Sequence, residues 1–318
     1  MQPHGLHHVT AVTAKVKDNL DFYTKLLGLR LVKKTVNQDD VSAYHLYYAD
    51  KLGTPGTDMT FFDWPQTPKA RRGTDSIVNT MFRINGADAL NYWLARFDEY
   101  GVTHKGIEEF AGRRIIRFED SEGQRLTLVD DHGADYEGEL WDGAGIPLDY
   151  AIRGFYAVAL SVPLLEPFEP IFAQLMGFEK VTTLPSLDNP DDQVAIYAMD
   201  GGGPNKEVHV IEQRNAPRAA PGYGGVHHVA FRMRDEAERD AWINKLNELG
   251  VRHSGLVERY YFQSLYFRIS NGILFELATD EPGFSVDEPI ESLGERLALP
   301  PFLEPHRAQI EANLVPVG

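Results

Sequence analysis

Two stretches of this chain recur almost unchanged a long way downstream. Residues 5–9 (Gly-Leu-His-His-Val) return as residues 225–229 (Gly-Val-His-His-Val). Residues 101–106 (Gly-Val-Thr-His-Lys-Gly) return as residues 250–255 (Gly-Val-Arg-His-Ser-Gly). Self-similarity of this kind predicts a fold built from repeated structural units, with each repeat facing an equivalent one. A doubled histidine that occurs once in each half also suggests that the repeat brings histidines together.

Hydrophobic periodicity defines the unit. In residues 86–100, Leu90, Trp93, Leu94 and Phe97 recur at the spacing of one helix face, and a glycine ends the segment. Residues 236–249 have a matching helical pattern and are also followed by glycine. Runs rich in β-branched and aromatic residues predict strands after each helix. They lie at 43–49, 57–63, 113–118, 124–130, 193–199, 207–212, 261–269 and 273–279. The chain is therefore predicted to contain four βαβββ modules and to belong to the α+β class.

A module of roughly 55–65 residues is too small to bury one sheet face well, so modules should share a core in pairs. We expect two domains, an N-terminal one over 1–135 and a C-terminal one over 150–285, each with two modules. Glycines and a proline interrupt any period between 131 and 150, which favours a boundary there. Residues 286–318 are expected to form a tail that wraps the surface, and a lid role is left open.

Composition excludes several classes of function. The 318 residues carry a net charge of −16, which argues against nucleic acid and against an anionic membrane surface. No cysteine is present, so disulfides, thiolate metal sites and iron–sulfur clusters are excluded. No secretory signal and no membrane-spanning apolar run is apparent, so a cytoplasmic protein is expected.

Metal-ligating residue types occur at equivalent places in modules one and four. Each begins with a doubled histidine, and Glu276 lies in the middle of an apolar strand in module four. At that strand position modules one and two carry Thr60 and Thr127 instead. Because neighbouring strand residues face opposite ways, one histidine of each pair can point into a shared cavity, but alternation does not say which. Two imidazoles and one carboxylate form the non-haem Fe(II) pattern, which leaves positions for substrate and dioxygen. The alternative is packed histidines and an ion-paired Glu276.

These features resemble the vicinal oxygen chelate superfamily, which includes glyoxalases, bleomycin resistance proteins and extradiol dioxygenases. Within it, residues 45–60, 259–276 and 293–301 are most similar to hydroquinone and chlorohydroquinone dioxygenases. The resemblance implies modules paired into curved, barrel-like mixed sheets. It also implies an Fe(II)-dependent extradiol-type enzyme that inserts O2 into a hydroquinone-type or catechol-like ring. Mn(II) is an alternative metal, because it accepts similar ligands. The implied partners are a small aromatic substrate and O2, and self-association is left open.

The resemblance also implies individual residues. The implied metal ligands are His8, His228 and Glu276, the second histidine of each pair. The implied substrate-pocket residues are His7, Thr10, His227, Arg259 and Tyr266. Among them, His227 is the candidate acid and base, Tyr266 the candidate proton donor and Arg259 the cation for an oxyanion. Each has a structural alternative, namely a packed imidazole, a barrel-filling aromatic ring and a solvated surface charge.

Two other functions compete with ring cleavage. A glyoxalase-type isomerase or lyase uses two histidines and two carboxylates, and the threonines at positions 60 and 127 count against it. A non-catalytic small-molecule-binding protein on the same fold would need no metal at all. The matching His104 and His253 each follow a helix-ending glycine, and we interpret them as structural.

Overall fold

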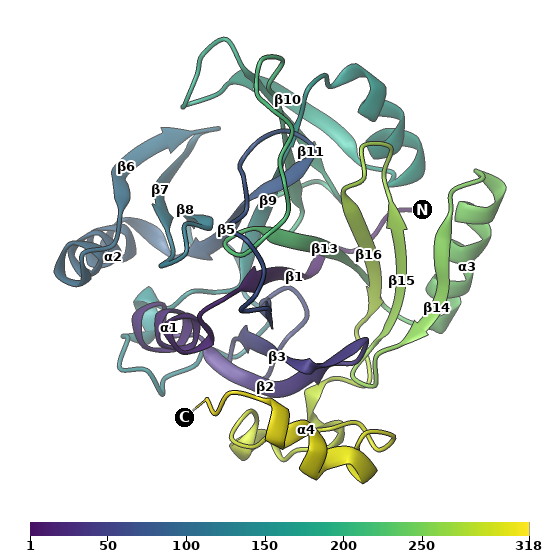
Figure 1. Cartoon of the computed structure of the whole chain (residues 1–318). Coiled ribbons are helices and arrows are strands. Elements are labelled where there is room, and N and C mark those ends of the chain that lie inside the picture. Colours follow the sequence, from purple (N-terminus) through teal and green to yellow (C-terminus); the bar gives the residue numbers. More distant parts are fainter. Residues whose placement is uncertain (318) are drawn as a thin grey trace.

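The computed structural model describes residues 1–317, and their strands form two eight-stranded sheets (Figure 1). Four modules follow one another along the chain. The first contains β1 (Leu6–Thr13), α1 (Val16–Asp21), β2 (Arg30–Asn37), β3 (Asp40–Ala49) and β4 (Asp58–Asp63). The second contains β5 (Ser76–Ile84), α2 (Gly86–Tyr100), β6 (His104–Phe110), β7 (Arg113–Glu119) and β8 (Arg125–Asp130). The third contains β9 (Phe155–Val162), short turns at Glu166–Phe168 and Ile171–Leu175, β10 (Glu179–Pro185), β11 (Gln193–Ala198) and β12 (Glu207–Glu212). The fourth contains β13 (Val226–Met233), α3 (Glu236–Glu248), β14 (His253–Glu258), β15 (Gln263–Arg268) and β16 (Leu274–Thr279).

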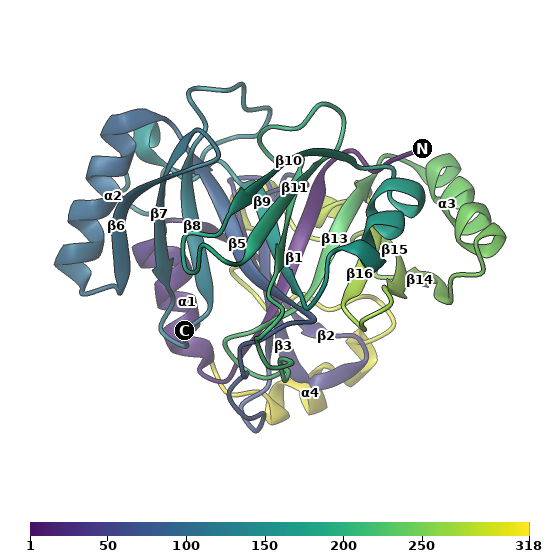
Figure 2. The same cartoon turned by 90° about the horizontal axis from the view of Figure 1, so that it is seen from above.

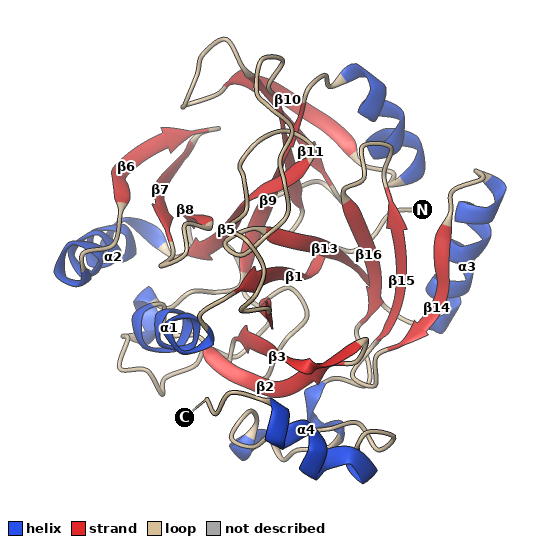
Figure 3. Ribbon diagram, viewed as in Figure 1, coloured by secondary structure: helices blue, strands red, loops and turns tan. Residues whose placement is uncertain are grey.

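The predicted α+β class with four βαβββ modules is confirmed. Each helix forms where an apolar stripe meets a sheet. In α2 the buried side chains include Leu90, Trp93 and Phe97, and Gly101 ends the helix at φ 66°, a left-handed conformation that suits glycine. In α3 the side chain of Asp235 accepts a hydrogen bond from the backbone N–H of Glu238 and caps the first turn. Figures 2 and 3 show the helices on the outside and the strands between them.

Each of the two sheets takes strands from both halves of the chain. The first sheet has the order β14-β15-β16-β13-β1-β4-β3-β2 and joins modules one and four. The second has the order β10-β11-β12-β9-β5-β8-β7-β6 and joins modules two and three. A cut between 131 and 150 therefore separates the strands of both sheets. The division into 1–135 and 150–285 remains a prediction about folding units.

Strand register in the first sheet places distant residues side by side. The central strands β1 and β13 are antiparallel, with His8 opposite Ala230 and Thr10 opposite His228. Parallel β16 places Glu276 beside Ala230, and parallel β4 places Thr60 beside Thr10. The first and fourth modules thus meet at the centre of one sheet.

The residues after β16 cover the outside of β2 and β3. Their helix α4 (Arg307–Asn313) is the yellow segment below these strands in Figure 1. The buried Lys33 of β2 donates hydrogen bonds to the Phe284 carbonyl and to the carboxylates of Asp287 and Glu288, which ties this segment down. Among the described helices, none has the length and apolar character to cross a bilayer.

Candidate metal centre

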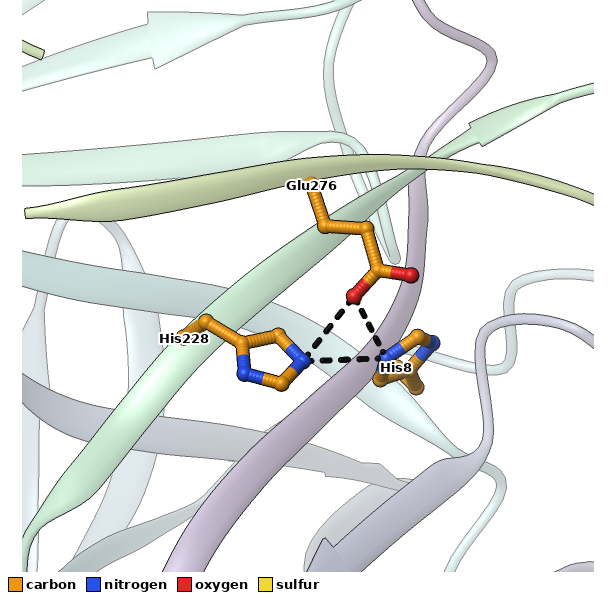
Figure 4. Close-up of side chains that lie close together, drawn as sticks. All are labelled: His8, His228 and Glu276. Atoms are coloured by element: carbon orange, nitrogen blue, oxygen red, sulfur yellow. Dashed lines mark hydrogen bonds and ion pairs between the residues drawn. The ribbon is translucent and has the colours of Figure 1, made fainter. Parts of the chain in front are cut away.

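Three side chains from three neighbouring strands converge inside the first sheet. His8 comes from β1, His228 from β13 and Glu276 from β16 (Figure 4). One carboxylate oxygen, Glu276 Oε2, lies 3.1 Å from His8 Nε2 and 2.9 Å from His228 Nε2. The two Nε2 atoms are 3.3 Å apart. Within residues 1–317, no other group of three metal-ligating side chains gathers in this way.

The donor set fits a divalent cation. Glu276 is fully buried, and a buried carboxylate is costly unless a positive charge or hydrogen-bond donors compensate it. Ser264 Oγ donates a 2.5 Å hydrogen bond to Glu276 Oε1, which leaves Oε2 turned toward the two imidazoles. Burial alone would raise the pKa of Glu276, but His8 and His228 hold that pKa well below its ordinary value. The site is therefore built to keep this carboxylate charged.

The first histidine of each pair contacts the second. His7 Nδ1 lies 3.0 Å from His8 Nδ1, and His227 Nδ1 lies 2.7 Å from His228 Nδ1. His7 Nε2 donates to the Thr279 carbonyl at 3.1 Å, because a carbonyl can only accept. Burial lowers the pKa of His7 to about 3, so this ring is neutral and its Nδ1 is an acceptor. His8 must then donate from Nδ1, which leaves the Nε2 lone pair free for a metal.

A small cavity of about 30 Å³ opens beside the three ligands. It is lined by His8, His45, Tyr47, Phe62, His228, Arg259, Phe262, Tyr266 and residues 37–39. Arg259 Nε donates to the Tyr266 hydroxyl at 3.2 Å, and the guanidinium lies over the Tyr266 ring. On the other side of the guanidinium, Arg259 Nη2 forms an ion pair with Oδ2 of the exposed Asp39 at 2.8 Å. Arg259 and Tyr266 therefore both line this cavity, and their roles toward a substrate remain predictions.

The other three expected pocket residues lie outside this lining. His7 and Thr10 are buried behind it, where Thr10 Oγ1 bonds Thr60 Oγ1 at 2.8 Å. His227 borders a neighbouring hollow and reaches the pocket only through His228. Burial lowers the pKa of His227 to about 3, so this imidazole is neutral, and its role as acid and base remains a prediction.

His45 is a pocket residue that sequence reasoning missed. It is on β3, and its ring links Thr60 Oγ1 at Nε2 (2.9 Å) with the Tyr47 hydroxyl at Nδ1 (2.9 Å). A continuous hydrogen-bonded chain thus runs from Thr10 through Thr60 and His45 to Tyr47. His45 occurs singly in an ordinary strand pattern, so the only available signal was its two-residue spacing from Tyr47, which places both on one strand face.

The sequence matches one family model and several curated proteins along most of its length. The family model described as "Glyoxalase/Bleomycin resistance protein/Dioxygenase superfamily" matches residues 5–128 and 155–286. MhqA of Bacillus subtilis (strain 168), which is named as a candidate ring-cleaving dioxygenase, is 47% identical over 317 residues and covers 100% of both chains. The chlorohydroquinone/hydroquinone 1,2-dioxygenase of Sphingobium indicum is 30% identical, with 94% of this chain and 92% of the relative covered.

A solved structure extends the likeness to three dimensions. The crystal structure of a candidate dioxygenase from Bacillus subtilis subsp. subtilis str. 168 superposes with a TM-score of 0.90 at 33% identity. The alignment covers 100% of this chain and 98% of the other. The arrangement of all four modules is therefore shared along the whole length of both chains.

Proposed function

The chain belongs to the glyoxalase/bleomycin resistance protein/dioxygenase superfamily, and we propose that it is a metal-dependent ring-cleaving dioxygenase that acts on hydroquinone-type rings. One observation carries the proposal. Within residues 1–317, the site offers three protein ligands, His8, His228 and Glu276, and no fourth. Thr60 is at the strand position in module one that matches Glu276 in module four, and its hydroxyl is already bonded to Thr10 and His45. A glyoxalase-type site would place a second carboxylate there.

The two imidazoles and one carboxylate would hold Fe(II), with Mn(II) as the alternative. When bound, the metal supplies open coordination positions for a phenolate oxygen and for dioxygen, and a route for electrons between them. The ligand set carries a single negative charge, so an anionic oxygen from the substrate is compatible with it. The proposed partners are therefore a small phenolic ring and O2.

Arg259 and Tyr266 would bind the substrate oxygen and deliver a proton. The Tyr266 hydroxyl accepts the Arg259 Nε–H, so its own proton is free to point toward the pocket. Burial raises the pKa of Tyr266, which keeps this proton on the oxygen until a stronger base forms. Arg259 is permanently charged and stabilises negative charge on an oxygen beside it.

The substrate would exchange with Asp39 at the mouth of the pocket. A cavity of about 30 Å³ holds little more than water, so an aromatic ring must displace side chains. Asp39 is 72% exposed and its carboxylate occupies one side of Arg259. An incoming phenolate would replace this carboxylate on the guanidinium, while Phe62 and Phe262 pack against the ring faces and exclude water.

His45 positions hydroxyl groups at the edge of the pocket. Its two ring nitrogens are hydrogen-bonded to Tyr47 and Thr60, so the ring orientation is held from both sides. Burial holds the pKa of His45 well below its ordinary value, so the ring stays neutral and would orient the Tyr47 hydroxyl toward the substrate rather than store a proton. His7 and His227 act indirectly by orienting His8 and His228 through their Nδ1 atoms.

The test is an oxygen-uptake assay on protein loaded with Fe(II) without air. Wild type should consume O2 with hydroquinone and substituted hydroquinones, and it should not form lactoylglutathione from methylglyoxal and glutathione. Glu276→Gln is the matched variant, because the amide keeps the shape and the Ser264 contact but removes the charge. We expect it to fold and to lose metal and oxygen uptake together. Lactoylglutathione formation by wild type, or uptake unchanged in Glu276→Gln, would contradict the proposal.

A further inference from the structure

The second sheet encloses a cavity of about 500 Å³, far larger than the metal pocket of the first. Each strand of this sheet, from β5 to β12, contributes residues to its wall. A volume of this size suits a small organic molecule. Figure 1 shows this sheet curling at the upper left, as the first sheet curls at the lower right.

Register places the cavity at the same position in its sheet as the metal site. In the first sheet His8 is opposite Ala230, whose parallel neighbour is Glu276. In the second sheet Asn79 is opposite Ala159, whose parallel neighbour is His209. Asn79 therefore replaces the first histidine and His209 replaces the glutamate.

The remaining equivalences follow in the same way. His228 is opposite Thr10 in the first sheet, and Ala157 is opposite Met81 in the second. The second imidazole is thus replaced by a methyl group. Among the described residues, no metal-ligating cluster forms in the second sheet. The exchange of bulky ligands for smaller side chains leaves space where the metal would be.

Charges in this cavity are unbalanced in favour of cations. Its three acidic side chains are each paired, Glu119 with Arg72 at 2.8 Å, Asp188 with Arg117 at 2.6 Å and Glu207 with His209 at 2.9 Å. Arg113 and Arg125 also line the cavity, and within residues 1–317 neither has a carboxylate partner. Burial, together with the charge of Arg72, lowers the pKa of Arg125, and the carboxylates of Asp188 and Glu119 offset this only in part.

A second polar group lacks a partner at the centre of the cavity. His209 is 4% exposed, and its Nδ1 has no hydrogen-bond partner among the described residues. The His209 side chain lies between the side chains of Glu207 and Ile211 on the cavity face of β12, because alternate residues of a strand share a face. A buried imidazole nitrogen without a partner is unusual, and a ligand atom would satisfy it.

A large part of the wall is apolar. Its apolar members include Val78, Met81, Ile115, Leu126, Val194 and Ile196, with the rings of Phe110 and Tyr156 beside them. Two guanidinium groups and one free imidazole nitrogen therefore share the cavity with a broad apolar surface. A ligand that matches it carries an acidic group on a flat apolar body.

We propose that the second sheet holds a metal-free binding site for a small amphipathic anion, such as an aromatic carboxylate or sulfonate. The site is separate from the metal centre and uses Arg113 and Arg125 for the acidic group, while His209 Nδ1, an acceptor because Nε2 donates to Glu207, takes a hydrogen bond from an N–H or O–H of the ligand. The apolar wall holds the rest of the molecule.

Binding is measured by fluorescence titration with 8-anilinonaphthalene-1-sulfonate, an amphipathic anion, and with uncharged N-phenyl-1-naphthylamine, which lacks the sulfonate. Wild type should bind one sulfonate probe per chain. Arg125→Gln should weaken the sulfonate probe at least about tenfold and leave the uncharged probe within about twofold, because only the charge-assisted contact is lost. Arg252→Gln removes an exposed charge elsewhere and is the matched control.

Ile211→Trp fills the cavity from a half-buried position and should abolish binding of both probes. Metal content and oxygen uptake should stay unchanged in Arg125→Gln, since Arg125 does not contact the metal centre. The proposal is overturned if wild type binds no sulfonate probe, if Ile211→Trp binds it as wild type does, or if Arg125→Gln and Arg252→Gln behave alike. Circular dichroism establishes that each variant is folded before titration.

Discussion

Replacement of His7 tests how the doubled histidine serves the metal centre. The buried His7 ring donates to the Thr279 carbonyl and accepts the His8 Nδ1–H. His7→Phe keeps a flat ring of similar size next to Phe262, whose ring centroid is 5.3 Å away. It removes both hydrogen bonds, so nothing then selects the His8 tautomer with a free Nε2.

The expected magnitude follows from these two contacts. Partners that orient a ligating histidine typically change metal affinity by about 10- to 100-fold, or roughly 1.4 to 2.7 kcal/mol. Two buried polar groups also lose their partners, Thr279 O and His8 Nδ1, at about 1 to 3 kcal/mol each. The metal-free protein should therefore be destabilised as well, although its ligands are all retained.

His7→Gln separates this mechanism from a loss of packing. A glutamine amide can donate to the Thr279 carbonyl from its nitrogen and accept the His8 Nδ1–H at its oxygen. We expect Fe(II) affinity, measured by competition with a chelator under nitrogen, to fall in His7→Phe and to recover largely in His7→Gln. His253→Phe removes a histidine from the start of β14 and should leave the affinity unchanged.

Equal Fe(II) affinity in wild type and His7→Phe would refute the reasoning. The same is true if His7→Gln binds as weakly as His7→Phe, because hydrogen bonding would then not explain the role of His7. Unfolding of the metal-free variants in guanidinium chloride measures the stability component separately.

Three further predictions concern the pocket and the fold. Tyr266→Phe should retain metal and lower kcat by about 10²- to 10⁴-fold, because its hydroxyl would deliver the proton; full kcat with normal metal content would exclude that role. His45→Phe should also keep metal but slow turnover, since it breaks the link between Tyr47 and Thr60; loss of metal instead would make His45 part of the ligand set. Burial raises the pKa of Asp120 to about 6. The Asp120 carboxyl group therefore stays protonated to a higher pH in the folded protein than in the unfolded chain. Its contribution to the free energy of unfolding falls by about 1 kcal/mol as the pH rises from 5 to 7. Asp120→Asn should remove that part of the pH dependence of the unfolding free energy, and identical slopes in the two proteins would contradict this.

Much of the local structure and the key residues of the site were predictable from sequence. The helix with Trp93 and Phe97 on one face ends at Gly101 as expected, because periodicity and a left-handed cap are local properties. Apolar surroundings made the carboxylate of Glu276 conspicuous, because an uncompensated charge is expensive in such a strand. The doubled histidines indicated that the repeat brings histidines together.

Which side chains line the cavities depended on how the strands pack together in the folded chain. His227 and His45 are examples. Strand alternation predicts that adjacent side chains point to opposite faces of the sheet, but it does not say which of the two faces a cavity. His227 is turned toward another hollow, and His45, which no repeat marks, lies in the pocket. The spacious cavity of the second sheet likewise arises from Asn79 and Ala157 in places that histidines occupy in the first.

The sequence by itself therefore determined the modules, their helices and the residue types available for a metal. Only the tertiary structure decided that module one shares a sheet with module four and module two with module three. Four similar modules have similar edges, so local pattern alone leaves several pairings open. The choice depends on side-chain packing and strand register between segments that are far apart in the chain.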